Sequence, residues 1–152
     1  MMSKIFNTPF EISLRILIIL SEYEGTYISI ERISITDFIS IYGGAFKISP
    51  TNLHGNNPFK FSEFTSRRSH MQLALKNLLA DGFVSVRCDE NGFTYSITEN
   101  GLRYSDTFES KYANLLRELV YRSRKYIEDS SERDILNLIN EFSVRSIMEG
   151  GR

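Results

Sequence analysis

The first clear hydrophobic pattern lies near the start of the chain. Apolar residues recur every three or four positions over residues 12–23, with further leucines and isoleucines between them, so this segment predicts a helix buried on most of its surface. Thr8 before Pro9 is a favourable N-cap, and Glu11 stands where a capping box places its carboxylate. Gly25 is suited to end the helix.

Residues 27–42 carry two patterns at once. Isoleucine and polar residues alternate over residues 28–35, which is typical of a strand. The segment also fits one face of a helix, which would carry Ile30, Ile33, Phe38 and Ile41. We predict a short extended piece at Tyr27–Ile28 and then a helix from about Ser29 to Tyr42, which Gly43-Gly44 terminates.

Residues 44–62 predict a long irregular connection, because prolines, asparagines and glycines that favour turns are frequent there. Loops of this length are uncommon inside a compact domain and are often functional. Aromatic side chains lie in the loop and just after it, at Phe46, Phe59, Phe61 and Phe64. They indicate either burial against the same domain or an interface with a partner.

The most regular pattern runs from residue 63 to residue 101. It begins with an amphipathic helix that is lined by Met71, Leu75, Leu78 and Leu79. Asp81-Gly82 ends that helix, and residues 83–88 and 93–97 then alternate as two strands. Asn91-Gly92 between the strands is typical of a tight hairpin turn.

The resulting order of helix, helix, helix, two-stranded wing and helix resembles a winged helix-turn-helix. Residues 78–84 look like the usual junction before the wing, and residues 95–101 look like the usual exit from it. The resemblance implies a mostly α fold with a small β-wing, with residues 1–101 as the winged-helix core. Winged helices often bind DNA, but many only dock other proteins, so this likeness predicts the fold better than the function.

Residues 102–148 predict a helical extension of that core. Apolar residues at helical spacing indicate one long helix from about Glu99 to Ile127, and Ser131 with Asp134 resembles an N-cap before a final helix. We favour packing of these helices on the core, with docking to a partner or to a second copy as the alternative. Residues 149–152 predict a flexible tail.

The composition fits one globular domain, with 152 residues, 41% hydrophobic residues and 24% charged residues. The net charge of −1 argues against a polybasic nucleic-acid coat. Residues 1–82 carry 8 basic and 7 acidic side chains, and residues 83–152 carry 10 and 12, so any DNA contact depends on a few arginines. No targeting signal is convincing, and the apolar run Ile16–Leu20 is too short to span a membrane. We expect a cytoplasmic protein without a membrane partner.

Few residues suggest chemistry. One Cys and two His cannot supply a four-ligand Cys/His zinc site, so we predict no metal. Gly43-Gly44 lacks the Lys-Ser/Thr that follows a phosphate-binding loop, so we predict no nucleotide cofactor. We expect His54 to bond turn carbonyls rather than act as a general base, and Cys88 to be a small buried side chain. The sequence therefore predicts a protein that is not an enzyme.

The basic residues near the expected recognition helix and wing are candidates for DNA contact, because arginine bonds guanine edges or phosphate in a fork. The candidates are Arg67, Arg68, His70, Lys76 and Arg87. The simpler interpretation is that Glu63 and Arg67, four residues apart, pair on the surface of a helix.

Two segments resemble the small middle components of ABC-three-component systems, including the Lamassu type of antiphage defence. They are residues 6–11 (FNTPFE) and residues 53–64 (LHGNNPFKFSEF), the second followed by Arg67-Arg68, and the likeness extends over about residues 6–116. It implies a non-catalytic accessory subunit that bridges or regulates an SMC-like ATPase and its effector, often a nuclease, in a prokaryotic antiphage or antiplasmid complex. Candidate interface residues are His54, Phe59, Lys60, Phe61, Phe64, Tyr112 and Leu119.

A free-standing winged-helix transcriptional regulator is the alternative function. It would bind a specific DNA sequence by itself, whereas the accessory subunit would be found with its ATPase. Double-stranded DNA and a second copy of the chain both remain open as further partners.

Overall fold

The computed structural model describes residues 8–55, 57–90 and 92–150. These residues form a mostly helical fold with a small antiparallel sheet, as the sequence predicts. In chain order the elements are α2 (Pro9–Glu22), β1 (Ile28–Ser29), α3 (Ile30–Ile41), α4 (Lys60–Ala80), β2 (Val84–Asp89), β3 (Gly92–Ile97), α5 (Glu99–Ser105), α6 (Lys111–Tyr126) and α7 (Glu132–Gly150).

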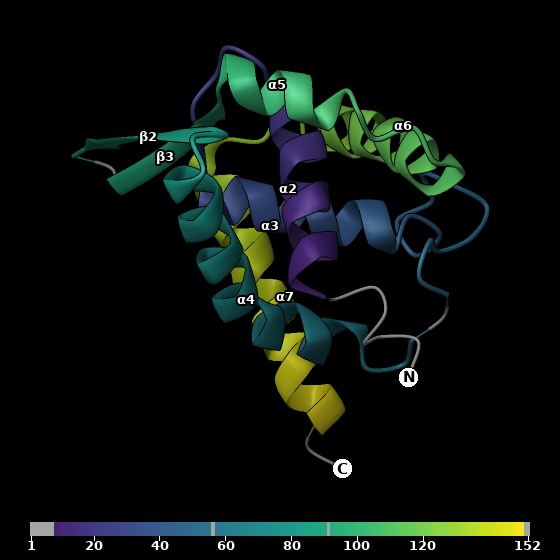
Figure 1. The fold of residues 1–152 in the computed structure, drawn as a ribbon. Coiled ribbons are helices and arrows are strands. Elements are labelled where there is room, and N and C mark those ends of the chain that lie inside the picture. Colours follow the sequence, from purple (N-terminus) through teal and green to yellow (C-terminus); the bar gives the residue numbers. More distant parts are fainter. Residues whose placement is uncertain (1–7, 56, 91, 151–152) are drawn as a thin grey trace.

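The sheet has the strand order β1-β3-β2, so the short β1 pairs with the return strand of the hairpin. The register of β2 and β3 runs from Val84 opposite Ile97 to Asp89 opposite Gly92. The predicted tight turn falls here, although its Asn91 lies outside the described residues. The hairpin projects sideways from the helices, beyond the end of α4 (Figure 1).

The predicted start of α2 is confirmed. The Thr8 hydroxyl oxygen accepts a hydrogen bond from the backbone N–H of Glu11 at 3.2 Å, and Pro9 occupies the first helical position. The Glu11 carboxylate bonds Arg15 and Tyr112. Nearly all of α2 beyond its first turn is buried, because α3, α4, α5 and α6 all pack against it.

The two patterns of residues 27–42 are both present, one after the other. Ile28 and Ser29 pair with β3, and Ser29 then caps α3 by accepting a hydrogen bond from the backbone N–H of Arg32 at 3.1 Å. Every residue of α3 from Ile33 onward is buried, including its polar ones, because α3 packs against α2, α4, α6 and α7. The helical pattern was hard to separate from the alternating one in the sequence. A helix that is buried on all sides has no polar face, so its apolar residues do not mark one side only.

The loop after α3 is shorter than predicted, because α4 begins at Lys60. The prediction that residues 44–62 form an irregular connection was therefore wrong for its last three residues. Phe59 precedes α4 and provides no side-chain cap. The Glu149 carboxylate of α7 takes that place, accepting hydrogen bonds from the backbone N–H groups of Phe61 at 3.3 Å and Ser62 at 2.9 Å.

The single helix predicted from Glu99 to Ile127 was also wrong. The chain leaves the helical path after Ser105, and Ser110 caps a new helix by accepting a hydrogen bond from the backbone N–H of Ala113 at 3.1 Å. Arg117 of α6 stabilises the break by donating to the carbonyl oxygens of Ser105 at 2.7 Å and Phe108 at 3.2 Å. A sequence pattern cannot show this break, because its apolar spacing fits a continuous helix.

The last helix begins where the sequence places it. Ser131 and Asp134 cap each other reciprocally, with side-chain to backbone distances of 3.0 and 3.1 Å. The predicted tail at residues 149–152 begins too early, since Glu149 and Gly150 belong to α7, and residues 151–152 lie outside the described residues.

In the part of the chain that the structure describes, two hydrophobic clusters form the core. One lies around α2 and contains side chains of β1, the second half of α4, the sheet and α6. The other surrounds Phe38 of α3 and contains Phe61, Phe64 and Phe142, whose rings lie 5.0–5.3 Å from the Phe38 ring. The helices of residues 102–148 therefore belong to the core, with α6 against α2 and α3, and α7 against α4 and α3. Among the described residues, no helix is both long and apolar enough to cross a membrane.

Candidate functional site

A buried aspartate lies at the junction of three helices. Asp37 of α3 accepts a hydrogen bond from Arg15 of α2 at 2.7 Å and another from Arg67 of α4 at 2.8 Å. All three side chains are almost completely buried. Burial alone would lower the pKa of Arg15, but the Asp37 carboxylate, together with Tyr112 and Glu11, raises it above its ordinary value. We call the bonded set that radiates from Asp37 the polar network.

One arm of the polar network reaches α6 and the loop. Arg15 donates to the Glu11 carboxylate at 3.2 Å, and the Tyr112 hydroxyl donates to the same carboxylate. His54 Nε2 lies 2.9 Å from the Tyr112 hydroxyl oxygen. Because Tyr112 gives its one hydroxyl proton to Glu11, His54 Nε2 is the donor in that bond.

The ionisation of this arm follows from its burial. Burial, with the Arg15 guanidinium close by, lowers the pKa of His54 to about 3, so the imidazole is neutral. Burial and the bond to Glu11 raise the pKa of Tyr112 above its ordinary value, so the phenol keeps its proton.

The other arm runs from α4 to the loop. Arg67 donates to Glu63 at 3.0 Å, and the Tyr42 hydroxyl donates to the same carboxylate at 2.7 Å. The Asn57 amide in turn donates to the Tyr42 oxygen at 3.3 Å. Burial and the bond to Glu63 raise the pKa of Tyr42 above its ordinary value.

The polar network joins α2, α3, α4, α6 and the loop between α3 and α4. Among the described residues, no buried side-chain nitrogen or oxygen lacks a hydrogen-bond partner. The charges therefore satisfy one another, and removing one member would leave a buried charge uncompensated. The arrangement is suited to fixing the helices and the loop in one geometry.

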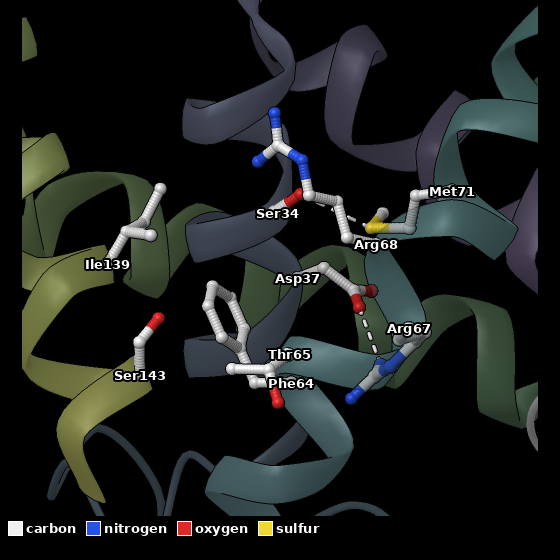
Figure 2. A pocket seen from close by; sticks show the side chains of 9 residues that line it. All are labelled: Ser34, Asp37, Phe64, Thr65, Arg67, Arg68, Met71, Ile139 and Ser143. Carbon is white, nitrogen blue, oxygen red and sulfur yellow. Dashed lines mark hydrogen bonds and ion pairs between the residues drawn. The ribbon is translucent and has the colours of Figure 1, made fainter. Parts of the chain in front are cut away.

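A small pocket of about 120 Å³ lies beside Asp37 and Arg67, between α3, α4 and α7. Figure 2 shows the Asp37–Arg67 pair on one side, with Ile139 and Ser143 of α7 across from it. Phe64 and Met71 contribute apolar surface. A space this small holds a few waters rather than an organic substrate.

A larger hollow of about 640 Å³ lies between α4 and the β2–β3 hairpin. Its floor is made by Ile30, Leu75 and Leu79, and it opens between exposed side chains of α4 and of the hairpin. We call it the α4–hairpin groove. It is the larger of these two hollows, and exposed side chains of α4 and the hairpin, among them Gln72, Lys76 and Val86, form its rim.

The structure separates the candidate DNA-contact residues. Arg67 is only 4% exposed and is bonded to Asp37 and Glu63, so the expectation that it faces DNA was wrong. The alternative pairing with Glu63 is present, although it is inside the protein rather than on its surface. Arg68 donates to Glu31 at 2.6 Å at the edge of the groove.

The other three DNA-contact candidates are exposed. His70 and Lys76 are both exposed, on different sides of α4. Arg87 lies on β2 with its guanidinium carbon 4.0 Å from the centre of the Tyr27 ring, a cation–π distance. Of these three residues, only Lys76 lines the α4–hairpin groove.

The candidate interface residues divide in the same way. Phe61, Phe64 and Leu119 are buried in the core, so they offer no surface to a partner and the interface expectation was wrong for them. Phe59 is 54% exposed. His54 and Tyr112 bond each other, and the Lys60 ammonium lies 5.1 Å from the centre of the Phe61 ring.

His54 bonds the Tyr112 hydroxyl, a partner that the sequence did not indicate. The expectation that Cys88 is buried was wrong. Cys88 is exposed, because the hairpin extends beyond the helix that covers its first residues.

Sequence reasoning missed the centre of the polar network. Arg15 and Asp37 each stand inside a strongly apolar helical segment, which is the signal that could have found them. A charge at such a position is paired when it is buried, but the partner is not visible from one sequence. Within the described residues there is no cluster of three or more His, Cys, Asp or Glu side chains suited to a metal ion.

The family model of Middle Component 2 of ABC-three component (ABC-3C) systems, MC2, matches residues 5–149. The match spans nearly the whole chain, and the chain belongs to this family. No curated protein and no solved structure matches it.

Proposed function

We propose that this Middle Component 2 protein is a non-catalytic accessory subunit that bridges or regulates an SMC-like ATPase and its effector, a nuclease, in a prokaryotic antiphage or antiplasmid defence complex of the Lamassu type. The observation that carries the proposal is the family match over residues 5–149, since a middle component of a three-component system implies protein partners. The ATPase, the effector and the cytoplasmic location are parts of the proposal.

The polar network supports a role without catalysis. Its titratable groups are bonded to one another across four helices, and they hold the loop against the helices. A general base must lie within hydrogen-bond distance of the proton that it takes from the substrate. His54 instead donates its Nε2 proton to the Tyr112 hydroxyl inside the fold.

The element order supports a winged helix-turn-helix. We interpret the order α2, β1, α3, α4, β2, β3 as that of a winged helix, with α4 as the recognition helix and the β2–β3 hairpin as the wing. In this proposal the winged helix docks protein, because Arg67 is bonded to carboxylates inside the fold and Arg68 is paired with Glu31.

Co-expression of the full chain with the ABC ATPase and effector of its own system tests the proposal. We expect a complex that stays together through affinity purification and size-exclusion chromatography. The control is the chain expressed alone, which should elute at the volume of the free protein. Separate elution of all three components would reject the accessory-subunit proposal.

The second candidate is a free-standing winged-helix transcriptional regulator, and the exposure of Lys76 on α4 and Arg87 on the hairpin favours it. Each phosphate contact adds about 0.9 to the slope of log affinity against log salt. Loss of Arg68 would weaken binding by about 1–3 kcal/mol if it reads a base. Absence of binding by the isolated protein to any duplex at low salt would reject this candidate.

A further inference from the structure

We propose that the α4–hairpin groove is the docking site for an amphipathic helix of the partner ATPase, a helix whose apolar stripe is bordered on one side by carboxylates. This inference rests on the proposed function as an accessory subunit. It assigns the interface to a surface that the candidate interface residues of the sequence did not include.

The hairpin wall of the groove is apolar and exposed. Val86 on β2 and Phe93 on β3 are 44% and 60% exposed, and both line the groove together with Tyr95. In the register of the hairpin, Val86 stands opposite Tyr95 and Cys88 opposite Phe93, so these side chains lie on one face of the sheet. The groove thus presents a continuous apolar face that the helices of this chain leave uncovered.

The helix wall is polar and basic. Arg68, Gln72 and Lys76 of α4 line the groove at intervals of four residues, so they form a ridge along one side of the helix. The ridge spans about 12 Å, given a rise of about 1.5 Å per residue. Glu31 neutralises Arg68 at one end, and Lys76 at the other end is exposed.

The two walls together define the occupant. A segment that fits must be apolar along the side that meets Val86 and Phe93, and it must carry carboxylates along the side that meets Lys76 and Gln72. An amphipathic helix presents such parallel stripes at i, i+3, i+4 and i+7, and a groove with an apolar floor is the usual receptor for one. The pairing of an acidic edge with the α4 ridge also fixes the direction and register of that helix.

A DNA backbone fits the groove less well. Phosphates gain nothing from the apolar hairpin wall, and Glu31 lies at the end of the basic ridge. Asp89 and Glu90 stand at the tip of the hairpin, where they would repel a phosphate chain. These charges favour a protein over a nucleic acid at this surface.

The test uses the full chain in complex with its ATPase. Phe93→Asp and Lys76→Glu each alter one wall, and both residues are exposed, so the fold should be retained, which circular dichroism checks. The matched control is Leu73→Asp, on the same helix and 56% exposed but outside the groove. We expect each groove variant to weaken ATPase binding by about tenfold or more, as for the loss of an interface anchor, and the control to change it by less than about twofold.

A photo-crosslinking residue in place of Phe93 identifies the occupant in the purified complex. A crosslink to an ATPase peptide with apolar residues at helical spacing and flanking Asp or Glu supports the proposal. Crosslinks to DNA, to a second copy of this chain or to a peptide without that pattern would overturn it. Normal assembly by both groove variants would overturn it as well and leave the accessory-subunit proposal intact, whereas failure of the unaltered chain to assemble would reject the proposed function itself.

Discussion

The polar network and the α4–hairpin groove share helix α4 but differ in what surrounds their charged groups. In the network, Arg67 is enclosed and its guanidinium is bonded to two carboxylates. In the groove, Lys76 lies further toward the C-terminal end of the same helix and is exposed. The enclosed charge therefore contributes to stability and the exposed one is available for recognition. Neighbouring basic residues in one sequence cluster can thus have opposite roles, and burial decides which role each has.

The largest effect that this comparison predicts is on the network. Asp37→Ala leaves Arg15 and Arg67 buried without their shared partner, which should lower the free energy of unfolding by about 3–5 kcal/mol. Urea denaturation of the full chain measures it. The control Glu118→Ala removes an exposed ion pair with Arg122 and should cost less than about 1 kcal/mol. Equal costs for the two variants would contradict the distinction between enclosed and exposed charges.

The second effect is a pH dependence of the network arm at His54. The pKa of His54 is about 3 in the fold and about 6.5 in an unfolded chain, so between these values only the unfolded chain binds the proton. The free energy of unfolding should therefore fall as the pH decreases, by about 2 kcal/mol from pH 7 to pH 5 on account of this group. Thermal or urea denaturation across that range measures the fall.

His54→Gln should make that fall smaller, because glutamine does not titrate and its amide can still donate to Tyr112. The unaltered chain, measured over the same pH range, is the control. An equal fall in the two proteins would show that the enclosed imidazole is not the titrating group.

A smaller effect is expected at the start of α4, which both regions share. Glu149→Ala removes the carboxylate that accepts hydrogen bonds from the backbone N–H groups of Phe61 and Ser62, and should cost about 1 kcal/mol. Glu141→Ala, on the same helix but paired with Arg145 at the surface, should cost less than about 0.5 kcal/mol. If the Glu149 variant matched its control in urea denaturation, α7 would not contribute to capping α4.

The smallest expected effect on stability lies in the groove. Phe93→Ser should change the free energy of unfolding by no more than about 0.5 kcal/mol, because most of the Phe93 side chain is already in water. Urea denaturation checks this in parallel with the binding measurements. A loss of several kcal/mol would show that the exposed apolar wall serves the fold of the isolated chain.

The sequence predicted most elements of the fold correctly. The cap of α2, the strand-to-helix change at Ser29, the hairpin and the reciprocal cap of α7 all depend on neighbouring residues, and each was confirmed. The start of α4 and the break between α5 and α6 were not predicted. Both depend on side chains that are distant in sequence, Glu149 for the first and Arg117 for the second.

The candidate site was predicted less well. The segment with His54 and Glu63, followed by Arg67, was one of the two that resemble the family, and these residues do take part in one bonded network. Their roles were nevertheless misjudged for Arg67, Phe61 and Phe64, which are buried. A pattern of residue types shows that a segment is unusual. Where the segment is partly loop and partly helix, one helical periodicity does not extend over it, and the pattern does not show which side chains face inward.

The sequence by itself therefore determined what short-range physics controls: the helix caps, the periodicities, the tight hairpin and an overall charge too low for a basic arm. The tertiary structure alone decided whether each charged side chain is buried and paired or exposed at the surface. Whether an arginine is a surface group or a member of a buried cluster depends on a carboxylate 22 or 30 residues away, as for Arg15 and Arg67 with Asp37. The apolar wall of the groove is likewise a result of the tertiary structure, because the hairpin projects beyond α4 and leaves Val86 and Phe93 exposed on one face of the sheet.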